Sequence, residues 1–140
     1  MMQKNYQALV NGRIFFGGAA DVEAAVMNEK VDVVIDLRVK EPEAVTYNRV
    51  HAPIADEAEQ VEASIQHAVD EVLSAYHNGK KVFFHCGGGG GRAGTVAVGA
   101  LMELGQAKSV EEAEQQAKTI REKVNVREPM KKALQNIYEK

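Results

Sequence analysis

The strongest constraint on the fold is a run of five consecutive glycines, residues 87–91, that directly follows Cys86, the only cysteine of the chain. An apolar segment at Val82–Phe84 precedes it and has the length and residue types of a buried strand. Residues 92–104 contain no proline and are rich in small and aliphatic residues, which favours a helix. Strand, glycine loop and helix together predict an anion-binding site, because backbone N–H groups and the positive end of the helix dipole meet at the loop.

Two side chains at the ends of this loop, Cys86 and Arg92, indicate what the site does with an anion. A thiol beside converging N–H donors and a guanidinium is expected to ionise, because both stabilise the nucleophilic thiolate. An arginine can bind two oxygens of a phosphoryl group at once, and glycines, which lack a Cβ, let the loop close around a tetrahedral oxyanion. We therefore predict that Cys86 is a nucleophile and that Arg92 binds phosphate. The loop backbone is predicted to bind phosphate through Gly87, Gly88, Gly89, Gly90 and Gly91.

The rest of the chain alternates between strand and helix patterns, which predicts an α/β fold with a central, mostly parallel sheet of about four to five strands flanked by helices. Asn11 and Gly12 form a pair favoured in two-residue hairpin turns, so an N-terminal hairpin is expected. Residues 1–140 are expected to form a single domain. The predicted strands cover residues 6–10, 13–16, 31–37, 47–54 and 82–84, and the predicted helices cover 22–30, 56–78, 92–104, 110–124 and a segment that begins at Pro129.

The sequence from His85 through Cys86 and the five glycines to Arg92 resembles the His-Cys-X5-Arg signature of the cysteine-based protein tyrosine phosphatases, most closely that of the compact dual-specificity branch. The resemblance covers nearly the whole chain, and Val34–Arg38 is similar to the strand with an Asp-Leu-Arg-like end that precedes the acid loop in this family. It implies a protein-tyrosine-phosphatase-like fold and a phosphomonoester hydrolase that forms a cysteinyl-phosphate intermediate without a cofactor. The implied substrate is a phosphorylated protein or a small phosphomonoester.

The resemblance also implies a general acid, because the family uses an aspartate roughly thirty residues before the cysteine, and Asp56 has this position. A carboxylic acid near the anion site can donate a proton to the departing oxygen. Asp56 could instead cap the helix that follows it, and Asp36 and Glu57 remain alternative acids. Asp36 is expected to form a supporting ion pair with Arg38.

Two further residues near the loop, His85 and Thr95, are expected to support the site, and Ala93 departs from the family pattern. The family uses the histidine before the cysteine as a hydrogen-bonded scaffold, and His85 has this place. The family usually has serine or threonine directly after the arginine, where the hydroxyl stabilises the cysteine as a leaving group, but this chain has Ala93. Thr95 is the nearest hydroxyl on the same helix turn. The departure at Ala93 predicts slow breakdown of the phosphoenzyme.

Composition restricts the partners and the compartment. The net charge of −3 and a pI near 5.8 provide no global basic field, so neither nucleic acid nor an acidic membrane is an expected partner. No apolar span of about 18 residues and no signal-peptide pattern is present. A single cysteine cannot form a disulfide framework, which fits a reducing cytoplasm, and a monomer is expected. His51, His67 and His77 lack metal-ligand spacing, so no metal is assigned.

Two other functions are compatible with a cysteine in a loop before a helix. A rhodanese-like sulfur transferase needs no upstream acid, and a non-catalytic module could bind phosphorylated partners without cleaving them. Among substrates of a phosphatase, phosphotyrosine, phosphoserine or phosphothreonine, and small metabolites all remain open. The loop contains no lysine, which weighs against highly charged inositol phosphates.

Overall fold

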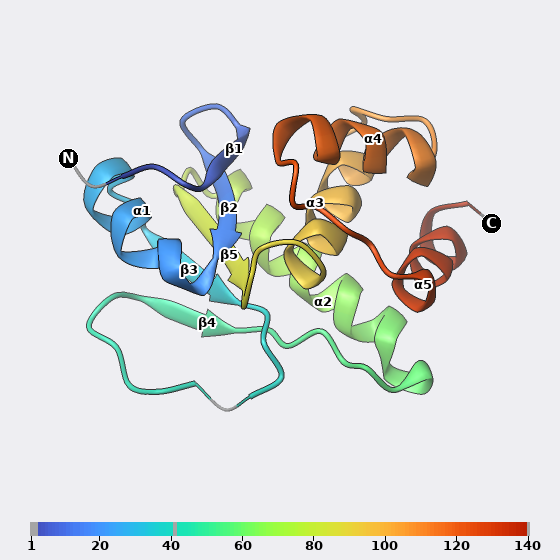
Figure 1. Cartoon of the computed structure of the whole chain (residues 1–140), viewed down its shortest axis with the longest axis horizontal. Helices are drawn as coiled ribbons and strands as arrows, with labels where there is room; N and C mark the ends of the chain where they lie inside the picture. Colours follow the sequence, from blue (N-terminus) through green and yellow to red (C-terminus); the bar gives the residue numbers. More distant parts are fainter. Residues whose placement is uncertain (1–2, 41, 140) are drawn as a thin grey trace.

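The computed structural model describes residues 3–40 and 42–139, and in them a five-stranded sheet forms the centre of the molecule (Figure 1). Its strands are β1 (Gln7–Val10), β2 (Ile14–Gly18), β3 (Val33–Asp36), β4 (Arg49–His51) and β5 (Val82–Cys86). They lie in the order β1-β2-β5-β3-β4, and only the β1–β2 pair is antiparallel. The predicted α/β fold, with a mostly parallel sheet and an N-terminal hairpin, is confirmed.

Helices cover the two faces of this sheet unequally (Figure 1). The helices are α1 (Val22–Glu29), which follows a short 3-10 turn at Ala19–Asp21, α2 (Ala58–His77), α3 (Arg92–Glu103), α4 (Val110–Ile120) and α5 (Glu128–Tyr138). The α1 helix packs on one face over a small apolar cluster that includes Phe83. The remaining helices enclose a larger cluster on the other face, which includes Phe84 and Cys86. Successive residues of β5 therefore point to opposite faces, as the pleat of a strand requires.

The central strand β5 carries Cys86 to the edge of the sheet where the active site is expected. It lies between β2 and β3, and Cys86 pairs with Gly18 while His85 pairs with Asp36. The parallel strands β2, β3 and β5 all end at this edge, so the loops that follow them gather around Cys86. In α/β sheets this carboxyl edge is where ligands bind.

The hairpin loop is one residue longer than Asn11 and Gly12 suggest. Val10 pairs with Ile14, which leaves Arg13 in the loop rather than in the second strand. Gly12 has a φ of 73°, a left-handed conformation that glycine adopts without steric strain. The predicted pair therefore makes the turn, with one additional residue after it.

Two predicted elements end earlier than expected. The strand predicted at 47–54 is limited to β4, because Pro53 has no N–H to continue the ladder, although Ile54 still donates its N–H to the Leu37 carbonyl at 3.1 Å. The helix predicted at 110–124 ends at Ile120, and Arg121 is extended with φ −137° and ψ 109°. Within the described ranges, no helix has the length and apolar character needed to cross a membrane.

Candidate active site

The sulfur of Cys86 lies inside the glycine loop at the amino-terminal end of α3. Its Sγ accepts hydrogen bonds from the backbone N–H groups of Gly89 at 3.3 Å and of Ala93 at 3.4 Å. These donors and the positive end of the α3 dipole stabilise negative charge on the sulfur. Although Cys86 is only 6% exposed, it lines a pocket of about 430 Å³ together with residues of the glycine loop and Arg92. The cysteine therefore faces a cavity that can hold an anion.

All five carbonyl groups of the glycine loop accept hydrogen bonds from residues outside the loop. Because C=O and the next N–H point in opposite directions across a trans peptide, this arrangement turns the amides of the loop toward its interior. The acceptor–donor pairs are Gly87 with Ala19 N at 2.9 Å, Gly88 with Arg121 Nη2 at 3.2 Å, Gly89 with Arg121 Nε at 2.8 Å, Gly90 with Asn125 N at 2.9 Å, and Gly91 with Thr95 N and Oγ1 at 2.9 Å each.

The structure brings Asp56 to Arg92, which lines this pocket. Arg92 donates from Nε to the Ile54 carbonyl at 2.9 Å and from Nη2 to Oδ1 of Asp56 at 2.7 Å. The Asp56 side chain is 65% exposed, so it can exchange this partner for a substrate without a large desolvation cost. Glu57, not Asp56, is the N-cap of α2, and Asp56 does not act as the helix cap considered from sequence.

Comparison with known proteins agrees with this geometry. The family model described as "Swiss Army Knife protein, DSP-PTPase phosphatase domain" (PTP-SAK) matches residues 21–136. The chain belongs to this family of phosphatase domains. A comparison with curated proteins finds no match.

Solved structures of phosphatases are similar over nearly the whole chain. Tk-PTP in its active form has 25% sequence identity and a TM-score of 0.78, with 99% of each chain covered. PTPMT1 has 20% identity and a TM-score of 0.78, over 96% of this chain and 94% of that chain. Human DUSP28 has 19% identity and a TM-score of 0.78, over 99% of this chain and 95% of that chain. The similarity to PTPMT1 and to DUSP28, at 20% and 19% identity, shows a shared fold.

Arg121 is a residue of this phosphatase domain that the sequence-based interpretation missed. It is 4% exposed, and besides its bonds to the loop carbonyls it donates from Nη1 to the Asn5 carbonyl and to Oε1 of Gln7, both at 2.7 Å. Its Nη2 lies 3.9 Å from Oδ2 of Asp21, which itself accepts the N–H of Gly18 at 2.8 Å. Arg121 thus fixes the outer side of the glycine loop to the N-terminal strands.

At only some of the five glycine positions do neighbouring atoms lie too close for a Cβ. A Cβ on Gly89, where φ is 80°, would lie 2.6 Å from the Gly17 carbonyl carbon and 2.6 Å from Nη2 of Arg121. A Cβ on Gly90 would lie 2.5 Å from the carbonyl oxygen of Lys123. A Cβ on Gly87 or Gly88 would meet nothing within 4 Å. The packing of the loop therefore depends on Gly89 and Gly90.

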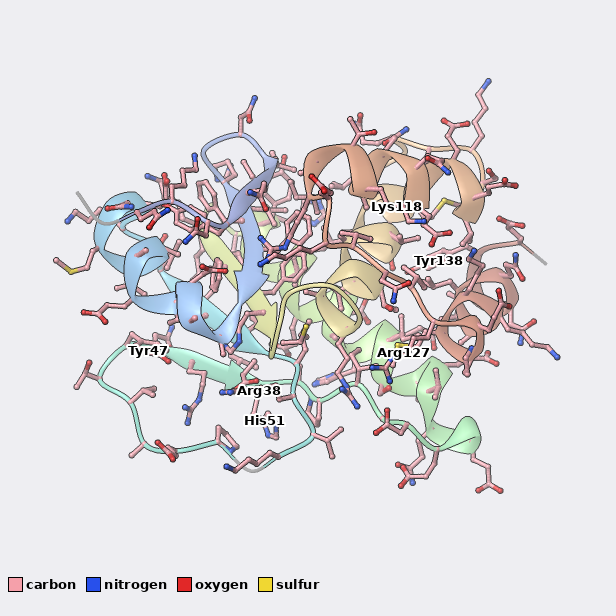
Figure 2. All side chains as sticks on the ribbon, in the orientation of Figure 1. Arg38, Tyr47, His51, Lys118, Arg127 and Tyr138 are labelled. Atoms are coloured by element: carbon pink, nitrogen blue, oxygen red, sulfur yellow. The ribbon has the colours of Figure 1, made fainter. Side chains whose placement is uncertain are left out.

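Asp36 lies in the core of the phosphatase and is paired with Arg38. Its carboxylate accepts Nε of Arg38 at 3.0 Å, Nη2 at 2.9 Å and the backbone N–H of Arg38 at 3.0 Å. Burial alone would raise the pKa of Asp36, but the hydrogen bonds from Arg38 outweigh it and hold that pKa below its ordinary value. A carboxylate kept ionised in this way is a poor general acid. Figure 2 shows Arg38 beside His51, whose Nε2 lies 2.6 Å from the Arg38 carbonyl.

His85 is buried on the α1 side of the sheet, away from the sulfur of its neighbour. Its Nδ1 lies 3.1 Å from the Cys86 carbonyl, and its ring stacks on Phe83 with centroids 5.8 Å apart. In the described part of the chain, Nε2 has no hydrogen-bond partner. Burial lowers the pKa of His85, since no solvent is available to stabilise the imidazolium. His85 is therefore placed to orient the backbone at Cys86 rather than to act as a base.

This burial predicts a pH-dependent stability. The folded protein holds His85 neutral, whereas the unfolded chain binds a proton there below about pH 6.5, so the free energy of unfolding should fall as pH falls through that value. Urea unfolding of wild type and His85→Asn at several pH values measures this contribution. We expect wild type to lose up to about 1.4 kcal/mol more than the variant per pH unit below about 6. The other histidines are present in both proteins, and parallel pH curves would contradict the prediction.

Thr95 supports the loop rather than the sulfur. Its hydroxyl donates to the Gly91 carbonyl at 2.9 Å and lies 3.3 Å from Sδ of Met130, and neither contact involves Cys86. The side chain of Ala93 offers no hydroxyl, but its backbone N–H donates to the sulfur. The donors to the Cys86 sulfur are therefore backbone N–H groups rather than a hydroxyl of residue 93 or 95.

Proposed function

We propose that this phosphatase hydrolyses phosphomonoesters through a cysteinyl-phosphate intermediate and without a metal ion. The observation that carries the proposal is the Cys86 sulfur, bonded by two backbone N–H groups inside the pocket that Arg92 lines. The thiolate attacks phosphorus and the bond to the ester oxygen breaks, while the inward-facing amides and Arg92 stabilise the equatorial oxygens. Water then attacks the phosphorus of the intermediate, which releases inorganic phosphate and returns the thiolate.

Asp56 is the proposed proton donor and acceptor in these two steps. Its carboxyl lies next to Arg92, whereas Asp36 is held in the pair with Arg38. Among the described residues, the Glu57 side chain forms no hydrogen bond or ion pair with the site. In the first step the acid gives its proton to the departing oxygen, and in the second the carboxylate accepts one from water. To take part in these proton transfers, the Asp56 side chain must leave Arg92 when the phosphoryl group binds.

Replacing Asp56 with asparagine is expected to lower kcat about 10²-fold for an alkyl phosphate, because general acid catalysis typically contributes about 10²- to 10⁴-fold. The loss should be smaller for p-nitrophenyl phosphate, whose leaving group needs no proton. Glu57→Gln is the matched control, since Glu57 is the adjacent exposed carboxylate, and it should retain activity on both substrates. An equal loss in the two variants, or none in Asp56→Asn, would remove the role of Asp56.

The covalent step can be tested directly by acid quenching. The protein is mixed with an aryl phosphate in the presence of EDTA, stopped within the first turnovers, digested and analysed by mass spectrometry. We expect phosphate on the peptide that contains Cys86, and an initial burst of phenol, because Ala93 provides no hydroxyl to assist breakdown of the intermediate. Transfer of sulfur from thiosulfate without phosphatase activity would favour a sulfur transferase, and binding of phosphate without turnover would favour a binding module.

The substrate is a phosphomonoester, and we propose that the protein acts on it as a monomer in a reducing cytoplasm. The support is chemical, since the nucleophile must stay reduced and the chain has no second cysteine to protect it by a disulfide. Size-exclusion chromatography with light scattering and activity assays with and without reductant test these two statements.

A further inference from the structure

The pocket above Cys86 contains more positive charge than the hydrolysis of one phosphomonoester requires. Arg92, Lys123 and Arg127 all line it, and none of the described residues in its lining is acidic. The loop amides and Arg92 already suffice for the oxygens of the phosphoryl group that is cleaved. Lys123 and Arg127 are therefore two cations without a role in the proposed reaction.

These cations come from the segment that joins α4 to α5, which passes beside the glycine loop (Figure 1). Residues 122 and 123 form a turn, residues 124–127 follow without helix or strand, and Val124 and Val126 are buried. Lys123, Asn125 and Arg127 alternate with these buried valines and line the pocket. The sequence Lys-Val-Asn-Val-Arg thus presents a polar, basic edge to the site.

The backbone holds this edge against the loop. Asn125, midway between the two cations, donates its N–H to the Gly90 carbonyl at 2.9 Å. The carbonyl oxygen of Lys123 lies so close to Gly90 that a Cβ there would be 2.5 Å from it. Figure 2 labels Arg127 where the segment reaches α5. The positions of both cations relative to Cys86 are therefore set by the main chain.

The protein does not neutralise either cation. Among the residues that the structure describes, the ion pairs involve other basic side chains, for example Arg121 with Asp21 and Lys131 with Glu114. Lys123 and Arg127 are exposed and have no carboxylate partner among these residues. Two unpaired cations on one wall of a pocket attract an anion to that wall.

We propose that the substrate is a small phosphomonoester with a second anionic group, phosphate or carboxylate, that Lys123 and Arg127 bind while the glycine loop holds the phosphate to be cleaved. The proposal rests on the proposed hydrolase function and adds the class of substrate. A volume of about 430 Å³ favours a small molecule, since pockets for such ligands measure about 300–1,000 Å³. The absence of lysine in the loop itself is thus compensated by the α4–α5 segment.

The test compares kcat/KM for a hexose bisphosphate with kcat/KM for the matching hexose monophosphate, measured as phosphate release. A charge-assisted hydrogen bond is worth about tenfold or more, so we expect wild type to prefer the bisphosphate by about 100-fold. Lys123→Gln and Arg127→Gln should each reduce this preference about tenfold, and the double variant should abolish it. Lys108→Gln, an exposed charge change just before the start of α4, should keep the wild-type preference.

The outcomes separate this inference from the proposed function. Hydrolysis of both sugars with equal kcat/KM, or a preference that survives in the double variant, would overturn the inference and leave the hydrolase intact. A preference for phosphopeptides with acidic neighbours over small bisphosphates would overturn the small-molecule class. If neither sugar is hydrolysed, calorimetry with the Cys86→Ser protein measures binding of the two sugars. Tighter binding of the bisphosphate, lost when Lys123 and Arg127 are also replaced by glutamine, supports the inference. Equal binding of the two sugars contradicts it.

Discussion

Replacing Cys86 with serine is expected to reduce kcat for any phosphomonoester by about 10⁴-fold or more, because removal of a covalent nucleophile leaves only the binding and charge stabilisation of the site. Serine is nearly isosteric with cysteine, but an alcohol is far harder to ionise than a thiol. The N–H groups of Gly89 and Ala93 that stabilise a thiolate are insufficient to generate an alkoxide. Phosphate release from p-nitrophenyl phosphate and from an alkyl phosphate, in EDTA, measures the effect.

Binding provides the control for this variant. The glycine loop keeps its carbonyl partners when the sulfur is replaced, since none of them involves the Cys86 side chain. Inorganic phosphate should therefore still raise the Tm of the Cys86→Ser protein. Turnover above about one hundredth of the wild-type rate in this variant would exclude Cys86 as the nucleophile.

The second large effect is expected from Arg121→Met, which keeps an unbranched apolar stem and removes the guanidinium donors. The substitution leaves buried carbonyls at Gly88 and Gly89 without their partner and Asp21 without its nearby cation. Loss of one member of a buried charged pair typically costs about 3–5 kcal/mol, and we expect that decrease in the free energy of unfolding. Because the loop carbonyls then lose their anchor, kcat/KM should also fall about 10²-fold.

Two control variants, Arg121→Lys and Lys118→Met, test whether the effect depends on the guanidinium of Arg121. Lysine retains the charge but only one donor atom, so this variant should remain folded while kcat/KM still falls, since two carbonyls cannot be held in the same geometry. Lys118, labelled in Figure 2, lies one turn earlier on α4 with a side chain that is 44% exposed, and its replacement should change stability by less than about 1 kcal/mol. Full activity of Arg121→Lys, or equal destabilisation in Lys118→Met, would contradict the role of Arg121.

Local patterns were sufficient to predict the fold and the centre of the site. The segment from Val82 to Arg92 predicts strand, loop and helix from adjacent residues, and the structure has them in that order. Asp56 was chosen because the family that the chain resembles has its general acid roughly thirty residues before the cysteine, and the structure brings Asp56 to Arg92. The first prediction needs only local patterns, whereas the second also needed the resemblance.

The residues that hold the loop from outside could not be predicted in the same way. Arg121 follows a helical pattern, and only tertiary contacts to Gly88 and Gly89 distinguish it from a solvated arginine. The alternation at residues 123–127 was a usable signal, because valines at every second position indicate one buried side of a non-helical segment rather than the end of a helix. Pairing between segments more than 30 positions apart depends on packing that a local pattern does not contain.

The resting pair of Arg92 and Asp56 means that the arginine of the site already has an anionic partner before any substrate arrives. An incoming ester must exchange with that carboxylate, and the displaced carboxylate is the same group that we propose as the proton donor. In the proposed mechanism, arrival of the substrate and release of Asp56 from Arg92 would be one event. Such an exchange would favour dianionic esters. Weak anions would bind less well, because they compete poorly with the Asp56 carboxylate for Arg92.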